Sequence, residues 1–262
     1  MLRILVTNDD GIDAPGLWAV AEALTDLGKV SVVAPDRDQS GVGTARTLLT
    51  ILRVNEVESK LEEVTAHTVS GTPSDCVILA DGSLFPERFD LLVSGINNGA
   101  NMGLDVLDSG TFGGALRGYF HGIPSIAVSV GGITDVDYGP AARVARSLAL
   151  RLSGESQDEP ILYNVNVPHV SEDRIRGVKA TTLGPKAYLE TIESGHDGWR
   201  SHYWIKHNRP TNQKTPEGCD VWAIRNNWVS ITPVDPEFVW GRSSGDLSEL
   251  TDSVAKDVGL SC

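Results

Sequence analysis

Two adjacent carboxylates, Asp9 and Asp10, end a short apolar run close to the N-terminus. Residues 2–6 have the continuous apolar character of a buried parallel strand, and open α/β sheets bind ligands at the carboxyl ends of such strands. Neighbouring acidic groups repel each other unless a cation or a shared proton relieves them, and carboxylates favour a hard divalent cation such as Mg²⁺ or Mn²⁺. Successive strand residues point to opposite faces, so Asp9 and Asp10 can both reach one cation only if the chain turns there. Gly11 makes such a turn easy. The alternative is that one aspartate caps the following helix and the other is merely exposed.

Two further polar loops follow predicted strands and are expected to open onto the same edge of the sheet. Residues 34–43 contain Ser40, and residues 94–103 contain Asn97, Asn98 and Asn101. Neutral Ser and Asn oxygens can complete an octahedral shell around a hard cation without adding charge. Taken singly, Ser40 also fits a helix or turn cap, and Asn97 fits a turn residue that tolerates positive φ.

The segment Ser109-Gly110-Thr111 has the character of a helix N-terminus. Exposed N–H groups and the positive end of the helix dipole make such a terminus an anion site. A plain Ser cap is the alternative, but the glycines at 110, 113 and 114 weaken a helix. We therefore interpret this turn as a phosphate-binding element. His121 and Cys76 are interpreted as a helix-end histidine and a small buried residue.

The elements that must position these residues alternate between strand and helix over the first two-thirds of the chain, which predicts a mostly parallel sheet with crossover helices. Strands are expected at 2–6, 30–34, 47–54, 64–69, 90–94, 125–130 and 161–167. Helices are expected at 15–27, from the turn at 71–75 through 79, after the run 95–114 to about 121, and at 140–152. After about 170 the segments 174–182, 201–207, 220–225 and 228–232 are predicted as separate strands. Aromatic residues gather in this region, including Trp199, Trp204 and Trp240. Such a cluster is typical of ordinary hairpin packing or of a subunit contact.

Composition limits the classes of partner. The 262-residue chain carries 35 acidic and 22 basic residues, a formal net charge of −13. This charge disfavours duplex nucleic acid and anionic membranes, which need clustered Lys and Arg, but is compatible with a small phosphorylated substrate held by a metal and backbone amides. The chain shows no cleavable signal and no run of roughly 18 apolar residues. Cys76, Cys219 and Cys262 lie far apart without CxxC spacing, which favours a reducing cytoplasm over a disulfide framework or zinc site.

Together these segments resemble the survival protein SurE family of 5′/3′-nucleotidases. The motifs that carry the resemblance occur in the family's order over about residues 2–235: Ile4-Leu5-Val6-Thr7-Asn8-Asp9-Asp10-Gly11, Val33-Ala34-Pro35-Asp36-Arg37 with Ser40-Gly41, Gly71-Thr72-Pro73-Ser74-Asp75-Cys76-Val77, Ser94-Gly95-Ile96-Asn97 with Gly99-Ala100-Asn101-Met102-Gly103, Ser109-Gly110-Thr111, Gly122-Ile123-Pro124-Ser125-Ile126-Ala127, Asn164-Val165-Asn166-Val167-Pro168 and Val229-Ser230-Ile231-Thr232-Pro233.

The resemblance implies one SurE-like domain over 1–262, with a Rossmann-like α/β core at 1–170. The subregion 171–262 would hold a hairpin used in oligomerisation and a tail, giving a homodimer or homotetramer. The implied activity is hydrolysis of nucleoside 5′- and 3′-monophosphates by a metal-activated water, with one Mg²⁺ or Mn²⁺ per subunit. The implied metal ligands are Asp9, Asp10, Ser40 and Asn97, with Asp9 or Asp10 as proton acceptor. The implied phosphate-binding residues are Asn101, Ser109, Gly110 and Thr111.

Three departures from the family pattern bear on substrate preference. Asp38-Gln39 replaces the more usual Asn-Arg before Ser40, Asp108 replaces the usual Tyr before Ser109, and Lys206-His207 replaces common glycines. The rival hypothesis from another class is a non-enzymatic nucleotide-binding or phospho-signalling α/β module. It would require a separate phospho-accepting Asp and a Lys at a later strand end, whereas the strand at 90–94 leads into Ser-Gly-Ile-Asn.

Overall fold

The computed structural model describes residues 1–153 and 160–236. Within them, strands of the main sheet are β1 Leu2–Thr7, β2 Gly28–Pro35, β3 Val54–Val57, β4 Thr65–Val69, β5 Leu91–Asn98, β6 Ser125–Val130, β7 Leu162–Val167, β8 Gly177–Ala180 and β11 Trp228–Pro233. They lie in the order β3-β4-β2-β1-β5-β6-β7-β11-β8. The strands β4, β2, β1, β5, β6 and β7 run parallel, while β3 and β11 pair antiparallel with their neighbours β4 and β7.

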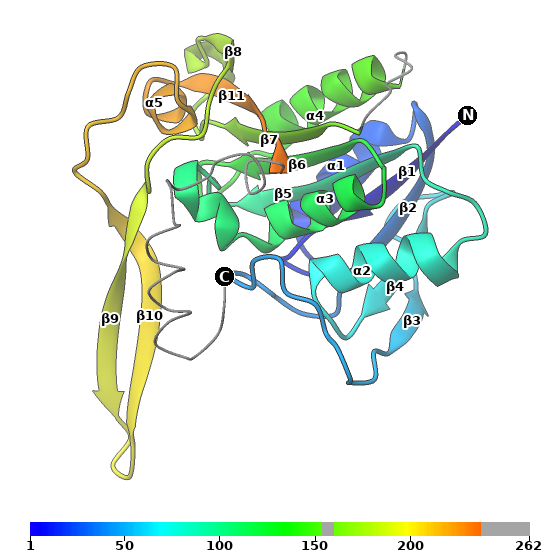
Figure 1. Ribbon diagram of the computed structural model, residues 1–262, viewed down its shortest axis with the longest axis horizontal. Coiled ribbons are helices and arrows are strands. Elements are labelled where there is room, and N and C mark those ends of the chain that lie inside the picture. The colour runs from blue at the N-terminus through cyan, green and yellow to red at the C-terminus, as the bar shows by residue number, and fades with distance from the viewer. Residues whose placement is uncertain (154–159, 237–262) are drawn as a thin grey trace, which may run out of the picture.

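Helices cover both faces of this sheet (Figure 1). The α-helices are α1 Pro15–Leu24, α2 Pro73–Leu79, α3 Gly110–Phe120, α4 Gly139–Leu152 and α5 Asp220–Arg225, with shorter turns η1 Ala80–Leu84, η2 Gly103–Leu107 and η3 Glu172–Arg174. A separate antiparallel hairpin, β9 Tyr188–His196 and β10 Ser201–Pro210, projects from the body. The predicted α/β sheet with flanking helices and a C-terminal hairpin is confirmed.

The order of the strands places a topological switch point at the end of β1. After β1, the strands β2 and β4 are added in turn on one side of it. The chain then crosses to the other side of β1, where β5, β6 and β7 are added in turn. The carboxyl ends of β1 and β5 therefore flank the point at which the strand order reverses, and open α/β sheets bind ligands at this point. Asp9 follows β1 and Asn97 lies near the end of β5.

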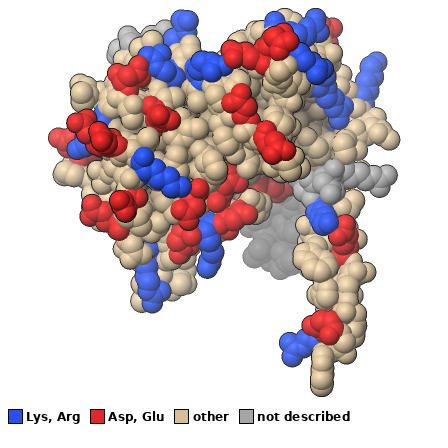
Figure 2. Space-filling model, turned by 180° about the vertical axis from the view of Figure 1, so that it is seen from behind, with Lys and Arg blue, Asp and Glu red and all other residues tan. Residues whose placement is uncertain are grey.

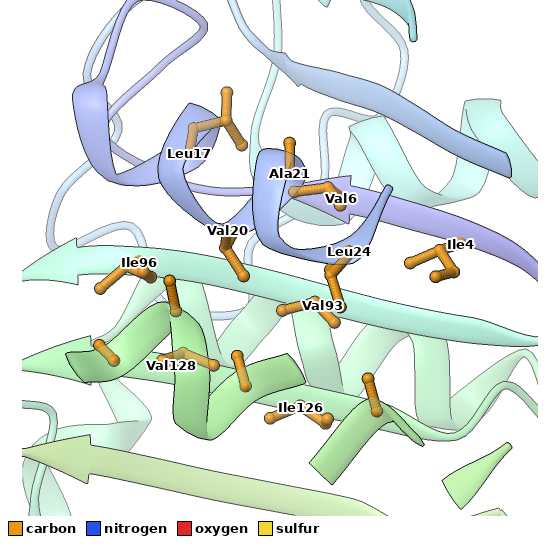
Figure 3. Packing of buried hydrophobic residues seen from close by; sticks show 14 of the residues in the cluster. Ile4, Val6, Leu17, Val20, Ala21, Leu24, Val93, Ile96, Ile126 and Val128 are labelled. Atoms are coloured by element: carbon orange, nitrogen blue, oxygen red, sulfur yellow. The ribbon is translucent and has the colours of Figure 1, made fainter. Parts of the chain in front are cut away.

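Two apolar layers hold the helices on the sheet. On one face, Leu17, Val20 and Leu24 of α1 pack against Val6 of β1 and Val93 of β5, and all five side chains are fully buried (Figure 3). Complete burial of one such aliphatic side chain contributes about 1.5–3 kcal/mol. The opposite face is covered by α2 and α3. Among the described residues, no helix combines the length and apolar character needed to cross a bilayer.

Several predicted elements differ from the structure. Residues 220–225, predicted as a strand, form α5, because six residues are too few to reveal a helical period and Cys219 caps the first turn. The predicted strand at 47–54 is a loop with β3 beginning only at Val54; Leu49 adopts a positive φ of 62° and is fully exposed. The first helix ends at Leu24 rather than 27, and β9 is absent from the predicted elements. Trp240 and the polar tail lie outside the described residues.

Gly16 allows α1 to reach the sheet beside the site. A Cβ added at Gly16 would lie 2.1 Å from the carbonyl oxygen of Ile96 and 2.9 Å from Cε1 of Tyr138. Gly16→Ala is therefore expected to lower the free energy of unfolding by about 1–3 kcal/mol, the range for overpacking a well-packed core. Urea denaturation measures this change. Gly82→Ala is the matched control, because no atom lies within 4 Å of its Cβ position; equal effects of the two substitutions would contradict the contact.

Candidate active site

The chain turns immediately after β1 because Asn8 holds it there. The buried Asn8 side chain donates from Nδ2 to the carbonyl oxygen of Gly11, at 2.9 Å, and accepts from the Gly11 N–H, at 3.2 Å. Gly11 has a φ of +95°, a conformation that favours glycine. The turn bends the backbone where Asp9 and Asp10 leave the strand, which removes the constraint that neighbouring strand residues face opposite ways. Asn8 is thus a positioning residue to which the sequence pattern assigns no role.

Asp9 lies beneath the N-terminus of α3. Its side chain is 3% exposed, and its Oδ1 accepts a hydrogen bond from the Thr111 hydroxyl. A Cβ at Gly110 would lie 2.7 Å from Cβ and 2.8 Å from Oδ2 of Asp9, so only glycine fits at that position. Burial raises the pKa of Asp9, although the bond from Thr111 opposes the shift. Asp9 and the predicted phosphate-binding turn are therefore in direct contact.

Asp10 is partly buried and contacts the end of β5. The backbone N–H of Asn98 donates to Oδ2 of Asp10 at 3.4 Å, and the Tyr138 hydroxyl donates to Oδ1 of Asn98 at 2.5 Å. Burial, and then the negative charge of Asp9, raise the pKa of Asp10 to about 7, with a smaller contribution from Asp38. Tyr138, which the sequence pattern does not single out, thereby supports the residue that contacts Asp10.

Within the described chain, the acidic pair has no basic partner. Among residues 1–153 and 160–236, every ion pair of a Lys or Arg involves a carboxylate other than Asp9 and Asp10. The same residues contain no group of three or more His, Cys, Asp or Glu side chains arranged to hold a metal. Two carboxylates can still hold a hard cation if neutral oxygens complete the shell. The site therefore depends on the Ser and Asn residues around the pair.

The loop that carries Ser40 is hydrogen-bonded to Asp9 and to Asp108, the residue before the cap of α3. The N–H of Gln39 donates to the carbonyl oxygen of Asp9 at 2.7 Å, and the N–H of Gly43 donates to that of Asp108 at 3.0 Å. The Ser40 hydroxyl donates to Oδ1 of Asp38 at 2.6 Å, which leaves its oxygen lone pairs available to a ligand. Asp38, which the sequence marks only as a departure from the family pattern, thus orients Ser40 and adds negative charge near the pair.

Asn97 is presented by an irregularity in β5. The pairing of β5 with β6 shifts in register between Ser94 and Asn97, and such bulges redirect side chains near functional sites. Its Nδ2 donates to the carbonyl oxygens of Gly99 and Asn98, at 2.7 and 3.2 Å, so Oδ1 is the acceptor end. The side chain is 8% exposed. This orientation presents an oxygen, as a metal ligand requires.

Asn101 is held by side chains from two buried strands. Its N–H donates to Oδ1 of Asn166, its carbonyl oxygen accepts from Nδ2 of Asn164 and Asn166, and its Nδ2 donates to Ser129 Oγ, each at 2.9 Å. Ser129, Asn164 and Asn166 are fully buried. One N–H of the Asn101 amide remains for a ligand. The signal for this support is present in the sequence, since two asparagines alternate within the apolar strand β7 and therefore share one face.

The turn at the start of α3 uses its hydroxyl groups for structure. Ser109 Oγ accepts from the N–H of Phe112 at 3.1 Å and caps the helix, while the Thr111 hydroxyl bonds Asp9. The N–H of Phe112 is therefore used by the cap, and the backbone N–H of Thr111 also bonds Asp9. What the turn offers an anion is the positive end of the helix dipole and the N–H groups at its start that these bonds do not use. The structure thus brings the turn, Asp9 and the Ser40 loop together. Asn97 and Asn101 come from the neighbouring β5 loop.

Comparison with known proteins gives a consistent result. The family model described as "Survival protein SurE" matches residues 4–190. The chain is 42% identical over 233 residues to a protein named 5′-nucleotidase SurE from Dehalococcoides mccartyi strain CBDB1, covering 88% of each chain. It is 38% identical over 258 residues to the protein of that name from Synechococcus elongatus, covering 95% of this chain and 100% of the relative. The crystal structure of a SurE protein from Aquifex aeolicus is similar with a TM-score of 0.75 and 34% identity, covering 96% of this chain and 99% of that one.

The raised pKa of Asp10 predicts a pH-dependent stability of the metal-free protein. In the folded chain this pKa is about 7, above the ordinary value of 3.8, so between these values the folded state binds a proton that the unfolded state has lost. Stability therefore falls as pH rises through this window. Asp10→Asn removes the penalty and is expected to melt a few degrees above wild type at pH 8 in EDTA, with the difference vanishing near pH 4.

Thermal melting at several pH values in EDTA measures this difference. Asp13→Asn is the matched control, because the Asp13 side chain is 96% exposed. It is expected to leave the pH profile unchanged. A constant offset between Asp10→Asn and wild type from pH 4 to 8 would show that the carboxyl does not titrate as described.

Proposed function

The chain belongs to the survival protein SurE family, and we infer that it is a 5′-nucleotidase, which releases phosphate from nucleoside 5′-monophosphates. We propose further that the reaction requires one divalent cation per subunit, Mg²⁺ or Mn²⁺, and that nucleoside 3′-monophosphates are also substrates. One observation carries the proposal: the adjacent carboxylates Asp9 and Asp10 have raised pKa values and no basic partner in the described chain, and Asp9 lies against the N-terminus of α3. A cation and a phosphate are complementary to the two halves of this arrangement.

The residues present fit a hard cation. Asp9 and Asp10 would supply the charge of the shell, and the oxygens of Ser40 and Asn97 would complete it without adding more. The orientation of Asn97 supports this assignment, since its amide nitrogen is used by two backbone carbonyls. A bound cation would supply Lewis acidity, which lowers the pKa of water and screens the charge of the phosphoryl group.

The remaining groups bind and orient the substrate phosphate. The N–H groups at the start of α3 that Ser109 and Asp9 do not use, together with the amide of Asn101, are fixed donors for phosphoryl oxygens. Donors held in place need no reorganisation as charge develops. Either Asp9 or Asp10 accepts the proton of the attacking water. Asp10 is the better placed, because Oδ1 of Asp9 already accepts from Thr111. A covalent aspartyl-phosphate is not expected, since both carboxylates are assigned to the cation.

The alternative of a phospho-signalling or nucleotide-binding module is less consistent with the strand ends. Such a module needs a phospho-accepting Asp separate from the acidic pair and a Lys after a later strand. Here β5 ends in Asn97 and Asn98, whose amides are bonded within the site.

We also propose a cytoplasmic location, which suits the free thiols of Cys76 and Cys219.

The hairpin is proposed to join subunits into a homodimer or homotetramer. Ile192 of β9 lies opposite Ile205 of β10, and Tyr203 shares their face. These side chains are 71%, 76% and 67% exposed, although the projecting hairpin also carries charged groups of both signs (Figure 2). A two-stranded hairpin is marginally stable alone in water. A second copy of the chain would bury this apolar face.

Activity and its cation dependence test the proposed function. Wild-type protein with Mg²⁺ or Mn²⁺ is expected to release phosphate from AMP, and EDTA to stop the release. Asp10→Asn is expected to lower kcat/KM by about a hundredfold or more, the scale of losing one preorganised electrostatic group. Asp13→Asn, an exposed carboxylate three residues away, is the control and is expected to retain activity. Phosphate release that persists in EDTA would overturn the cation requirement, and tight AMP binding without hydrolysis would favour the signalling module.

Oligomeric state tests the role of the hairpin. Ile205→Lys places a charge in the proposed interface, so sedimentation velocity is expected to show a smaller assembly than wild type. Leu150→Lys is the control, because Leu150 is 51% exposed on α4, away from the hairpin. A wild-type assembly size for Ile205→Lys would exclude this face as a subunit contact.

A further inference from the structure

We propose that Asp105 and Asp220 are positioning residues for phosphate binding, because they join the segment between Asn101 and Ser109 to the base of the β9–β10 hairpin. The hairpin base comprises residues 184–188 together with Thr211. The inference rests on the proposed function, in which Asn101 and the turn beginning at Ser109 hold the phosphate. The inference adds that the geometry of this phosphate site depends on how the hairpin base packs against η2.

Asp220 connects three separate segments through its carboxylate. It is fully buried, and its Oδ2 accepts from the N–H of Gly103 at 2.7 Å. Its Oδ1 accepts from the N–H of Gly184 at 2.8 Å and from that of Val221 at 2.7 Å. Charge-assisted bonds from backbone N–H groups are among the stronger hydrogen bonds in proteins. One side chain thereby fixes η2 to the start of the hairpin base.

Asp105 makes the second connection, from within η2. Its Oδ2 accepts from the N–H groups of Ala187 and Tyr188, at 3.0 and 3.1 Å. Tyr188 is the first residue of β9. The side chain of Asp105 is 5% exposed. The first strand of the hairpin therefore begins on a carboxylate that belongs to the segment between the phosphate-binding residues.

The two backbones touch without a side chain between them. Gly103 has a φ of +55°, and a Cβ added there would lie 2.1 Å from the carbonyl oxygen of Pro185. The other strand closes the base, since Thr211 donates from its N–H to the carbonyl oxygen of Ala187 at 2.9 Å and from its hydroxyl to that of Lys186 at 3.0 Å. The hairpin base and η2 therefore pack as one unit.

The joined segment reaches the proposed phosphate site at both ends. Asn101 lies two residues before η2, and Ser109, which caps α3, lies two residues after it. The N–H of Asp108 donates to the carbonyl oxygen of Asp105, and the N–H of Ser109 donates to that of Val106, at 3.1 and 3.3 Å. A displacement of η2 therefore moves the cap of α3 and the backbone that follows Asn101.

Asp220 is a buried carboxylate that depends on backbone hydrogen bonds. No Lys or Arg within the described chain is ion-paired with Asp220, and burial raises its pKa despite three backbone donors. Burying a charge without a cation is unfavourable unless several hydrogen bonds satisfy it. Here one of those bonds comes from Gly103, on the segment that joins the proposed phosphate ligands, so the position of that segment is tied to the satisfaction of a buried carboxylate.

Asp220→Asn tests the inference with little change in shape. The amide has one acceptor oxygen in place of two, so at least one of the three N–H donors loses its partner. With saturating Mn²⁺, KM for AMP and the inhibition constant of inorganic phosphate are both expected to rise about tenfold, the scale of one unsatisfied buried group. The dissociation constant for Mn²⁺ alone, measured by calorimetry, is expected to stay within about twofold, because Asp220 contacts none of the proposed metal ligands.

Asp81→Asn is the matched control. Asp81 is also a largely buried carboxylate, but it bonds His121 at the other end of α3, at 2.9 Å. This variant is expected to lose stability while keeping the wild-type KM and phosphate inhibition. If Asp220→Asn loses stability to the same extent as Asp81→Asn but keeps both constants within about twofold of wild type, Asp220 is only structural and the inference is wrong.

A measurement on the unmodified protein covers the case in which Asp220→Asn does not fold. Coupling between two sites is reciprocal, so phosphate with Mn²⁺ is expected to slow hydrogen exchange at the backbone amides of Gly184, Lys186, Ala187 and Tyr188, which the proposed phosphate site does not include. Unchanged exchange at these amides when phosphate binds would overturn the inference. If wild type neither binds phosphate nor hydrolyses AMP, the proposed function itself has failed, which is a different result.

Discussion

The removal of two adjacent carboxylates from water, one buried and one partly buried, is the constraint on which the rest of this structure depends. Asp9 and Asp10 lie where the strand order of the sheet reverses. Their raised pKa values express the cost of keeping both charged with no basic partner in the described chain. The surroundings satisfy the pair with neutral groups instead: the hydroxyl of Thr111 and the N–H of Asn98. A site of this kind keeps its negative charge available, which is what a divalent cation requires.

Neutral side chains make most of the joints that hold the site together. Asn8 shapes the turn after β1, and Asn164 and Asn166 hold the backbone of Asn101 from inside the sheet. Amide groups can donate and accept at once, so they satisfy buried backbone groups without adding charge near the acidic pair. Carboxylates serve the same purpose at η2, where Asp105 and Asp220 accept hydrogen bonds from backbone N–H groups of the hairpin base.

The parts of the fold that could be predicted from the sequence are those encoded in short windows. Short runs rich in apolar residues mark β1, β6 and β7, and the run of β1 places the acidic pair correctly just after that strand. Prediction fails where a segment is too short to show its period, as in α5, or where the apolar residues are exposed, as in the loop before β3. The approach of the Ser40 loop and of the end of β5 to the acidic pair follows from strand ends meeting at one edge, a rule of topology rather than of local propensity.

The sequence by itself determined the chemistry: two carboxylates, neutral oxygen donors and a glycine-rich helix start, in an order that resembles one enzyme family. Residue type and spacing are sufficient for this, because they state which ligands are possible. Only the tertiary structure decided how each group is used. Ser109 and Thr111 hold structure with their hydroxyls, Asn97 presents oxygen, and Asn101 is fixed by residues more than 60 positions away. Such roles depend on hydrogen bonds between distant segments, and no local pattern specifies which donor will meet which acceptor once the chain has folded.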